Sequence, residues 1–495
     1  MSWHHELVRV FYLLESAVIF YVGTINAVYF FLMVLGFFAL RQYRAQMIPE
    51  EQAALANSPL LPEVSIIVPA YNEAVTIVES LGALLNLRYP RYDVIVVNDG
   101  SNDATLRILI ERFQLCKSAC RTAAALPTKR VRAIYRSRSP IRLIVVDKEN
   151  GGKADATNAG LNFARSPLVA VVDSDSLLEP DALLHVVEPF LKDPGRVLAC
   201  GGIIRVVNGC DVDHGSVTRI STPRRAIALF QTIEYLRAFL GGRVAFSFFN
   251  SLLLISGAFG IFDREALVEI GGFLTTTLGE DMELVVRLHK RCRTKKLDYR
   301  IVFVPEPVCW TEVPESWATL RRQRNRWQRG TVETLTRHRD MLFRPAFGAP
   351  GLFALPYFLF FEMLGPAVEV AGYGLTIVGV CLGLISPEIA VWFFVVSVLF
   401  GILLSMSAVV LEEFTMRRYP SVADLGRLLA AAVLENFGYR QLLAAWRVEG
   451  LWDAILRRKS VWGVMKRQGF QRNLVQVRRN ANALSPMPLT PPRQS

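Results

Sequence analysis

The sequence predicts an α/β domain enclosed between apolar segments that are long enough to cross a membrane. Hydrophobic residues make up 52% of the 495 residues, a share that is high for a soluble enzyme and low for a protein buried wholly in lipid. Within 62–345, short β-branched runs alternate with amphipathic segments, which is typical of parallel strands joined by helical crossovers. Apolar runs flank this region on both sides. We therefore expect one α/β domain attached to transmembrane α-helices.

The first segment, 1–45, is expected to be a transmembrane helix. Its residues 16–40 carry no charge, and such a run is long enough to span a hydrocarbon core of about 30 Å. Arg41 and Arg44 follow at once. Because Lys and Arg gather on the cytoplasmic side of membrane proteins, this end of the helix and the domain after it are predicted to be cytoplasmic.

Four short apolar runs predict strands in the α/β domain. They are 64–68, 94–97, 143–146 and 168–172. Turn-forming residues follow each run, so the strands are expected to be short and separate. Residues 111–142 are basic and rich in Ala and Ser, without a strong period. We expect an inserted helix and loop there.

The segment 351–470 is expected to form transmembrane and interfacial helices. Residues 351–387 and 389–411 predict two spans, after which Arg417 and its neighbour mark a return to the cytoplasm. The next apolar stretch, 422–448, is interrupted by charged residues and predicts an interfacial or half-inserted helix. A third full span in this part of the chain is the alternative.

The net charge of +12 does not by itself indicate a nucleic-acid partner. No nucleic-acid-binding motif accompanies it, and in membrane proteins such a surplus more often lies in cytoplasmic loops. The basic stretch 457–479 fits this explanation. The final residues, 482–495, are rich in Pro and predict a disordered tail.

Polar turns follow the first two predicted strands. They contain Ala70, Tyr71, Asn72 and Glu73 after the first strand, and Asp99 after the second. Open α/β sheets bind ligands at the carboxyl ends of their strands, although turns of this composition are often only turns. Together they predict a nucleotide pocket in which Asp99 contacts the base or the sugar.

Candidate phosphate and metal ligands follow later strands. Lys153 comes after two glycines and before a predicted helix, so it could reach a phosphate, although the spacing is not that of a P-loop. Asp173 and Asp175 follow the run 168–172, where two close carboxylates are costly to desolvate without a cation. Such oxygen ligands suit Mg²⁺ or Mn²⁺, with coordination positions left for phosphate oxygens. An N-cap or a surface turn is the competing explanation.

A second acidic pair, Glu280 and Asp281, precedes another predicted helix. Acidic residues also favour a helix N-terminus for electrostatic reasons alone, and this is a serious alternative. The upstream segment with Ser256 and Gly257 suggests a shaped acceptor pocket beside the acids. A carboxylate in such a pocket could deprotonate a sugar hydroxyl.

A basic and aromatic cluster follows at Gln323, Arg324, Arg326 and Trp327. The guanidinium groups suit a pyrophosphate. Gln323 and Trp327 are four residues apart and so share one helical face, which suits an indole stacked on a sugar with an amide nearby. A lipid-facing anchor beside the membrane is the alternative.

In this order, the motifs PAYNE, NDGS, GGK, DSD, GED and QRNRW resemble the family 2 processive glycosyltransferases. That family includes cellulose, hyaluronan, chitin and poly-N-acetylglucosamine synthases. The resemblance is strong over about 62–330 and looser in the C-terminal membrane part. It implies a GT-A fold, which is a nucleotide-sugar-binding, Rossmann-like α/β fold, and a UDP-sugar donor.

The resemblance also implies roles for single residues. Asp281 would be the catalytic base, with Glu280 the next candidate, and Asp173 with Asp175 would hold the metal. The donor would be bound by Ala70, Tyr71, Asn72, Glu73, Asp99, Lys153, Asp173, Gln323, Arg324 and Arg326. The acceptor would be bound by Ser256, Gly257, Trp327 and Trp462. Trp462 resembles the start of the gating loop of hyaluronan synthases, although the residues after it depart from that motif.

The expected function is inverting transfer of a sugar from a UDP-sugar to a growing β-linked polysaccharide, coupled to export across the membrane. The expected setting is a bacterial-type inner (plasma) membrane crossed several times, with the catalytic domain cytoplasmic. The partners would be the UDP-sugar, a polysaccharide or oligosaccharide acceptor, the lipid bilayer and export proteins. The alternatives are single transfer to a lipid or protein acceptor, or a non-catalytic component that binds nucleotide-sugars. The intact acids favour an enzyme.

Overall fold

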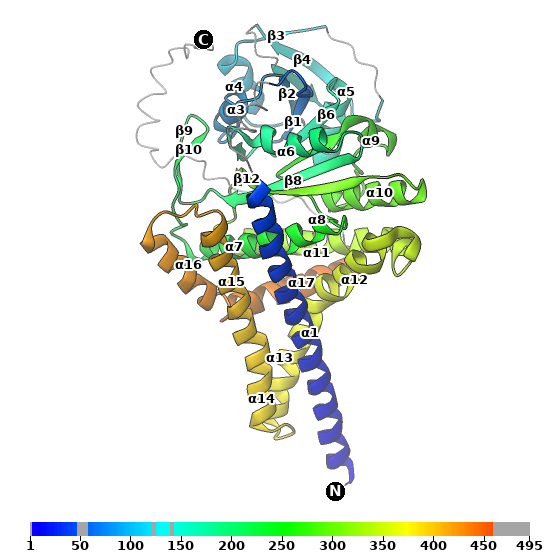
Figure 1. The fold of residues 1–495 in the computed structure, drawn as a ribbon, viewed down its shortest axis with the longest axis vertical. Helices are drawn as coiled ribbons and strands as arrows, with labels where there is room; N and C mark the ends of the chain where they lie inside the picture. Colours follow the sequence, from blue (N-terminus) through cyan, green and yellow to red (C-terminus); the bar gives the residue numbers. More distant parts are fainter. Residues whose placement is uncertain (1, 47–57, 120–124, 139–142, 459–495) are drawn as a thin grey trace.

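The computed structural model describes residues 2–46, 58–119, 125–138 and 143–458, and it places an α/β domain on top of a bundle of long helices (Figure 1). A layer of shorter helices lies between the two. The predicted tail 482–495 and Trp462 fall outside the described residues.

A ten-stranded mixed sheet forms the centre of the α/β domain. Its spatial order is β3-β4-β5-β2-β1-β6-β11-β8-β12-β7. The strands are β1 (Val64–Ala70), β2 (Tyr92–Asn98), β3 (Leu115–Lys117), β4 (Val131–Ser137), β5 (Leu143–Lys148), β6 (Leu168–Val172), β7 (Ser176–Leu178), β8 (Val197–Val206), β11 (Phe259–Asp263) and β12 (Arg300–Thr311). A separate hairpin pairs β9 (Asp211–Asp213) with β10 (Ser216–Arg219).

The four strands predicted from the sequence are confirmed, and they are parallel neighbours. β1 pairs with β2 and β6, and β2 pairs with β5. Every residue of β1 and of β6 is buried, as expected for strands covered on both faces. In the register of β1 and β2, Ala70 lies opposite Asn98, so the two polar turns begin level with each other.

The prediction of a helix and loop across 111–142 was wrong. This segment contains β3 and β4, which extend the sheet in antiparallel fashion beyond β5. In β4, Arg132 and Arg136 are exposed and the other residues are partly buried. The segment has no clear period-two pattern of its own, and pairing with β5 makes it a strand.

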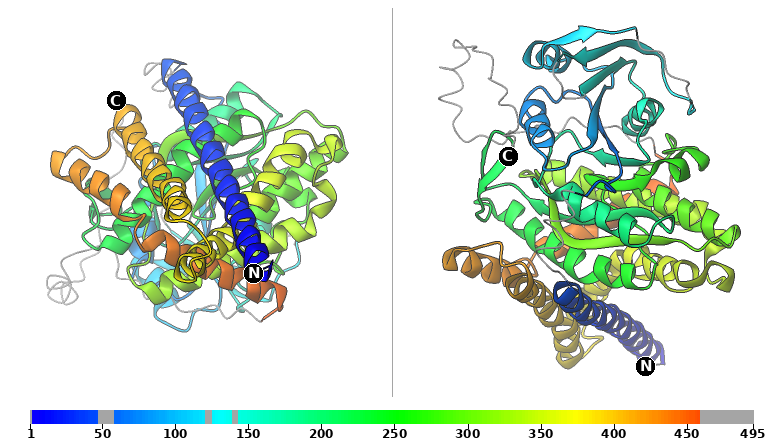
Figure 2. Two further views of the ribbon diagram at one scale, coloured as in Figure 1. Left: turned by 90° about the horizontal axis from the view of Figure 1, so that it is seen from below. Right: turned by 45° about the horizontal axis from the view of Figure 1, so that its top comes forward.

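Helices cover both faces of the sheet. They are α3 (Ile77–Leu85), α4 (Thr105–Arg112), α5 (Lys153–Phe163), α6 (Ala182–Lys192), α9 (Arg264–Glu269) and α10 (Glu280–Thr294). The intermediate layer contains α7 (Ala226–Leu236), a π-helical turn (Arg237–Arg243), α8 (Val244–Phe248), α11 (Trp317–Arg337), α16 (Val422–Leu434) and α17 (Tyr439–Ile455), as Figures 1 and 2 show.

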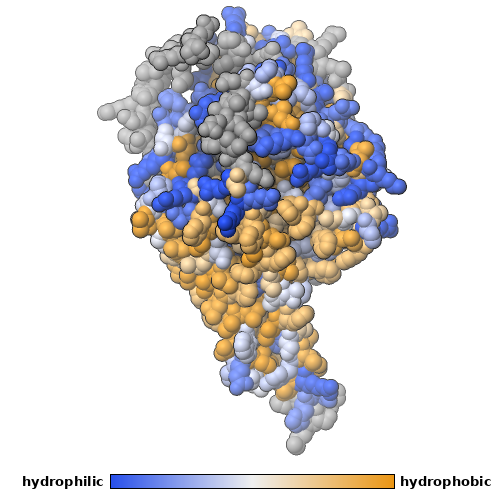
Figure 3. Space-filling view, in the orientation of Figure 1, coloured by the Kyte–Doolittle hydropathy of each residue, from blue (hydrophilic) through white to orange (hydrophobic). Residues whose placement is uncertain are grey.

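Three helices of the described residues are long and apolar enough to cross a membrane, namely His5–Ala45, Pro350–Cys381 and Pro387–Thr415. The first lies within α1 (Ser2–Gln46). The second ends with α13 (Gly365–Cys381), and the third joins α14 (Pro387–Phe394) to α15 (Phe400–Thr415). Apolar residues form a broad band over the lower part of the molecule, below the polar surface of the α/β domain (Figure 3).

The expected single interfacial helix at 422–448 is divided in two. α16 ends at Leu434, and Gly438, with a φ of 93°, stands at the N-cap of α17. This backbone conformation is open to glycine and strained for most other residues, so the chain turns here. After the turn α17 packs against α11 and α13. The helix that carries QRNRW therefore has a second helix along its side.

A buried histidine ties α10 to the rest of the α/β domain. The ring nitrogens of His289 lie 2.7 Å from the Tyr299 hydroxyl and 2.8 Å from the carbonyl oxygen of Leu252. Its side chain is fully buried. Burial lowers the pKa of His289 from 6.5 to about 4, because the charged imidazolium is poorly solvated there.

We expect the protein to lose stability as the pH falls from 6.5 towards 4. The unfolded chain takes up a proton on His289 near pH 6.5 and the folded chain only near pH 4, so acid favours unfolding in this window. The loss should be about 3 kcal/mol when complete. The melting temperature of His289→Asn should be lower than that of the wild type at pH 7.5. It should also fall less than that of the wild type when the pH is lowered. His214→Asn, at an exposed histidine, should keep the wild-type response, and equal acid sensitivity in both variants would contradict the assignment.

Candidate functional site

The two polar turns after β1 and β2 interlock at the carboxyl edge of the sheet. The amide of Asp99 donates to the carbonyl of Ala70 at 2.9 Å. The amide of Asn72 donates to the Ser101 hydroxyl at 3.0 Å, and the Asn72 side chain accepts from the amide of Asn102 at 2.8 Å. These bonds join the two turns, and Tyr71 beside them is 44% exposed.

Glu73 is the last residue of the first turn and contacts the starts of two helices. It is 8% exposed, its amide donates to the Thr105 hydroxyl at 2.9 Å, and its carboxylate accepts from the Thr76 hydroxyl at 2.7 Å. Glu73 thus joins the start of α3 to the start of α4.

Asp99 has protein partners in this structure, and its contact with the base or sugar stays a prediction. Its side chain is buried, and its carboxylate accepts from Lys148 Nζ at 2.6 Å and from the amides of Gly151 and Gly152 at 3.0 and 2.8 Å. Its oxygens are engaged by the protein, so Asp99 shapes the glycine loop that precedes Lys153. The sequence located Asp99 at the correct edge but could not show that its partners come from the next strand over.

Lys153 begins α5 and joins the two acidic motifs. Its Nζ lies 2.5 Å from Asp173 and 3.9 Å from Glu280, and it donates to the carbonyl of Gly257 at 3.1 Å. Burial lowers the pKa of Lys153, but the negative charges of Asp173 and then Glu280 raise it. The pKa is therefore raised overall. A cation is therefore held among carboxylates that come from separate parts of the chain.

Asp281 also contacts Gly257. Its Oδ2 accepts from the Gly257 amide at 3.2 Å, and its Oδ1 accepts from the amide of Met282 at 2.8 Å. The N-cap of α10 is Gly279, so the Asp281 carboxylate reaches across to the neighbouring segment and is not the N-cap group. Burial raises the pKa of Glu280, while the charge of Lys153 opposes that shift. The structure thus brings together Lys153, Asp173, Gly257, Glu280 and Asp281.

Gly257 is tightly enclosed in this cluster. A Cβ at this position would lie 3.1 Å from Lys153 Nζ and 3.3 Å from Asp281 Oδ2. The absence of a side chain therefore keeps the lysine and the carboxylate close to one backbone segment. The neighbouring Ser256 hydroxyl accepts from the amide of Ala258 at 3.4 Å, which makes a tight turn before β11.

The side chains at the end of β6 fit a divalent cation that is shared with a phosphate ligand. Asp173 is partly exposed and Asp175 is buried, and both follow the apolar strand. Among the described residues no group of three or more His, Cys, Asp or Glu side chains surrounds one point. A site with one or two carboxylates, completed by phosphate oxygens and water, is the arrangement in which Mg²⁺ usually binds with phosphates.

Helix α11, which carries the QRNRW motif, packs closely against the start of α10. A Cβ at Gly330 would lie 2.9 Å from the Cα of Gly279, and a Cβ at Gly279 would lie 3.1 Å from the Cα of Gly330. Only two glycines allow backbones to approach this closely. This contact explains why a glycine precedes the Glu280 and Asp281 pair, and Gly330 is a site residue that the sequence did not reveal.

Arg324 points towards the intermediate layer, and its role at a diphosphate stays a prediction. It is buried, donates to Glu234 of α7 at 2.7 Å, and lies over the Trp327 ring at 4.3 Å. Its charge is neutralised by the intermediate layer. Trp327 is 43% exposed, so part of its surface stays accessible.

The positive charge of Arg326 lowers the pKa of Glu280, although burial, Lys153 and Asp281 have larger effects on that pKa. Gln323 has an enclosed Oε1 with no hydrogen-bond partner in the described part of the chain. These two residues therefore remain candidates for ligand contacts.

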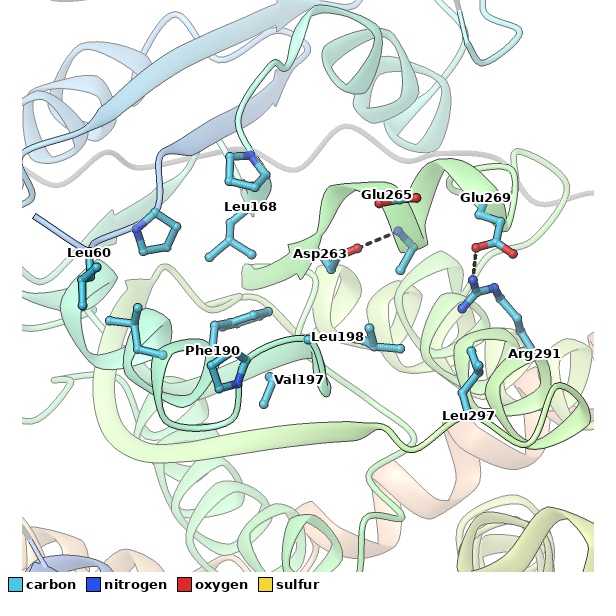
Figure 4. Close-up of a pocket in the computed structure, with 16 residues that line it drawn as sticks. Leu60, Leu168, Phe190, Val197, Leu198, Asp263, Glu265, Glu269, Arg291 and Leu297 are labelled. Carbon is cyan, nitrogen blue, oxygen red and sulfur yellow. Dashed lines mark hydrogen bonds and ion pairs between the residues drawn. The ribbon is translucent and has the colours of Figure 1, made fainter.

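A hollow of about 440 Å³ lies at the opposite edge of the sheet (Figure 4). It is lined by Leu168 at the start of β6 and Val197 at the start of β8, whereas Asp173 follows the other end of β6. Three of its charged side chains have protein partners: Asp263 accepts from the amide of Ala266, and Arg291 pairs with Glu269. It is not part of the carboxylate cluster.

Comparison with known proteins shows what this chain is similar to. A family model described as glycosyltransferase like family 2 matches residues 62–330, and one described as chitin synthase matches residues 274–452. Similar curated proteins include the poly-β-1,6-N-acetyl-D-glucosamine synthases of Staphylococcus epidermidis, 28% identical over 274 residues, and of Staphylococcus aureus (strain COL), 29% identical over 282 residues. The alignments cover 55% and 57% of this chain. They cover 56% and 57% of the relatives, so the chain spans little more than half of their length.

Two solved structures are also similar. One is the mannosyltransferase PcManGT from Pyrobaculum calidifontis in complex with GDP-Man and Mn²⁺, with 20% identity and a TM-score of 0.47, covering 88% of this chain and 100% of that chain. The other is Staphylococcus aureus TarS 1–349 in complex with UDP-GlcNAc, with 18% identity and a TM-score of 0.36, covering 77% of this chain and 92% of that chain.

Proposed function

Because the chain belongs to glycosyltransferase family 2 and its α/β domain has the GT-A fold, we propose that it transfers a sugar from a UDP-sugar to a growing β-linked polysaccharide. The observation that carries this proposal is the junction at Lys153. One ammonium group binds Asp173 at 2.5 Å and the carbonyl of Gly257 at 3.1 Å, while the amide of Gly257 binds Asp281. Side chains suited to binding a diphosphate and a carboxylate suited to accepting a hydroxyl proton thus lie next to Gly257.

The donor is assigned to the edge formed by β1, β2 and β6. The turn from Ala70 to Glu73, with the exposed ring of Tyr71, would hold the nucleoside, and Lys153 with Arg326 would face the diphosphate. Asp173 and Asp175 would hold Mg²⁺ or Mn²⁺, and the bound cation would neutralise charge on the diphosphate. Asp99 binds the glycine loop before Lys153, and we propose that it helps donor binding indirectly, by ordering this loop.

The reaction is proposed to be a single displacement. Asp281 accepts the proton of the acceptor hydroxyl while that oxygen bonds to the anomeric carbon of the donor sugar. The bond from this carbon to the diphosphate oxygen breaks at the same time, and UDP leaves with the electron pair. Attack from the face opposite the leaving group inverts the configuration. The partly exposed ring of Trp327, on α11, would stack on the acceptor sugar.

N-acetylglucosamine is the first sugar to test, since the similar curated proteins are named as polymerases of it. The membrane setting is part of the proposal: the catalytic domain faces the cytoplasm, where Arg41, Arg44, Arg417 and Arg418 would also lie.

Export of the polymer would pass beside polar groups at the level of the candidate spans. Glu362 accepts from Tyr29 of α1 at 2.9 Å and pairs with Arg447 of α17 at 3.0 Å. Arg447 in turn donates to Gln328 of α11 at 2.9 Å. A charged group at this depth normally faces protein or water and not lipid, so a polar route next to α11 is consistent with coupling to export.

Incubation of the full chain in lipid nanodiscs with a panel of radiolabelled UDP-sugars tests the proposal. We expect one UDP-sugar, UDP-N-acetylglucosamine first, to yield labelled product of high molecular weight together with free UDP. Label confined to a lipid or protein would support the single-transfer alternative. Binding of UDP-sugars without release of UDP from any of them would support a non-catalytic component.

A further inference from the structure

Helix α11 holds the loop that leads into the acidic pair of α10. Glu333 of α11 accepts two hydrogen bonds from this loop, one from the amide of Leu278 at 2.9 Å and one from the Thr277 hydroxyl at 3.0 Å. The same hydroxyl accepts from the amide of Gly279 at 3.3 Å. One carboxylate therefore ties down, directly or through Thr277, the two residues that precede Glu280.

A second contact of α11 with this loop lies three residues earlier on the helix. A Cβ at Gly330 would lie 2.9 Å from the Cα of Gly279, so the two backbones touch. Residues three apart lie on one face of a helix, and Gly330 and Glu333 therefore both face the loop. The backbone contact sets how near the loop comes to α11. The carboxylate sets the direction of the loop, because a hydrogen bond depends strongly on its angle.

The direction of the Asp281 carboxylate depends on where α10 begins. Its Oδ1 accepts from the amide of Met282 in its own helix at 2.8 Å, and its Oδ2 accepts from the amide of Gly257 at 3.2 Å. The first partner moves with α10, whereas Gly257 belongs to a different segment. A shift of the helix start would therefore carry Asp281 away from Gly257, beside which the acceptor hydroxyl is proposed to lie.

Other groups hold the rest of the interface between α10 and α11. Glu283 is fully buried and accepts from Arg287 Nη2 at 2.9 Å, and it lies 3.1 Å from Nε2 of His338 at the C-cap of α11. These contacts lie farther along α10 and do not involve Glu333. Loss of the Glu333 carboxylate is thus expected to misplace the start of α10 without separating the two helices.

We propose that Glu333 is a positioning residue for Asp281: it fixes the loop before α10 so that the carboxylate of Asp281 points at the acceptor hydroxyl. This inference rests on the proposed transfer reaction and adds a residue to it. Glu333 takes no part in the proton transfer and contacts neither substrate. Trp327 lies on the same helix, so the proposed acceptor contact and the support of the base share one rigid element, as a precise site requires.

The proposal predicts a loss of rate without a loss of donor binding in Glu333→Ala. The kcat of transfer should fall about 10- to 100-fold, since a misplacement of about 1 Å has an effect of this order. The KM for the UDP-sugar should stay within about twofold of the wild-type value, because the donor groups lie on other segments. Glu333→Gln keeps an oxygen that can accept from Leu278 and Thr277, so its transfer rate should stay within about threefold of the wild type.

The matched control is Arg337→Ala on the same helix. Arg337 is exposed and donates at 3.4 Å to the hydroxyl of Thr276, which lies one residue farther from the acids. This variant should keep the wild-type kcat. His338→Ala removes a contact elsewhere in the same interface, so it should lower the melting temperature and leave kcat unchanged at temperatures where the variant is folded.

A double-mutant cycle shows whether Glu333 acts through Asp281. In the Asp281→Asn background, Glu333→Ala should cost less than about threefold in rate, because the base that it positions is already lost. Equal losses in the two backgrounds would mean that Glu333 acts elsewhere. A raised KM for the donor with unchanged kcat would place Glu333 at the donor. Either result overturns the proposal.

Hydrogen exchange separates this inference from the proposed function. The amides of Leu278 and Gly279 should exchange about tenfold or more faster in Glu333→Ala than in the wild type or Arg337→Ala, because they lose the groups that protect them. An inert wild type would refute the proposed transfer, and faster exchange in Glu333→Ala alone would still support Glu333 as the group that holds the acidic pair. Unchanged exchange at these amides would overturn the inference, whether or not the wild type is active.

Discussion

Asp281→Asn should lower the rate of sugar transfer by about 10²–10⁴-fold, the usual contribution of a general base, while UDP binding stays nearly intact. The amide keeps the shape of the carboxylate but cannot accept a proton. Its oxygen can still accept from Gly257 or Met282, which now bind the two carboxylate oxygens. The measurement is turnover of the UDP-sugar together with UDP affinity in the same preparation.

The control for this variant is Asp263→Asn. Asp263 is the N-cap of α9 and accepts from the amide of Ala266 at 2.7 Å, at the far edge of the sheet. Weakening this cap should cost at most about 0.5–2 kcal/mol of stability and leave transfer unchanged. Near-normal turnover in Asp281→Asn would mean that Asp281 only supports the helix start and would make Glu280 the next candidate base. A large loss of UDP affinity would move Asp281 to the donor site.

Removal of divalent cations should stop transfer, with a loss of more than about 10³-fold in excess chelator. A bound cation stabilises a leaving diphosphate by several kcal/mol, and each 1.36 kcal/mol corresponds to about a factor of ten in rate. Adding back Mg²⁺ or Mn²⁺ should restore the activity, and the better of the two identifies the preferred ion. Full turnover in excess chelator would exclude the metal role of Asp173 and Asp175.

Substitutions test whether the carboxylates at the end of β6 are responsible for this metal dependence. Asp173→Asn should raise the metal concentration needed for half-maximal activity, because it removes one of two proposed ligands. Asp181→Asn changes an exposed carboxylate paired with Arg88 and should leave the metal titration unchanged. Metal titrations that coincide for Asp173→Asn and the wild type would show that the cation binds elsewhere.

The sequence predicted the parallel strands and the edge at which the motifs meet. β-Branched runs such as 64–68 and 168–172 are local signals that do not depend on distant partners. Parallel strands present their carboxyl ends at one edge, so the residue pattern alone is enough to expect Lys153, Asp173 and the turns after β1 and β2 near each other.

The tertiary structure decided where individual side chains point and which backbones touch. Arg324 faces Glu234, which is 90 residues away in the sequence, and Asp99 is engaged by Lys148 and the glycine loop. The strands at 111–142 form because β5 is there to pair with β4. Gly330 belongs to no motif. Its close approach to Gly279 follows from packing between two helices that are distant in the sequence, and the local pattern of residues carries no record of that packing.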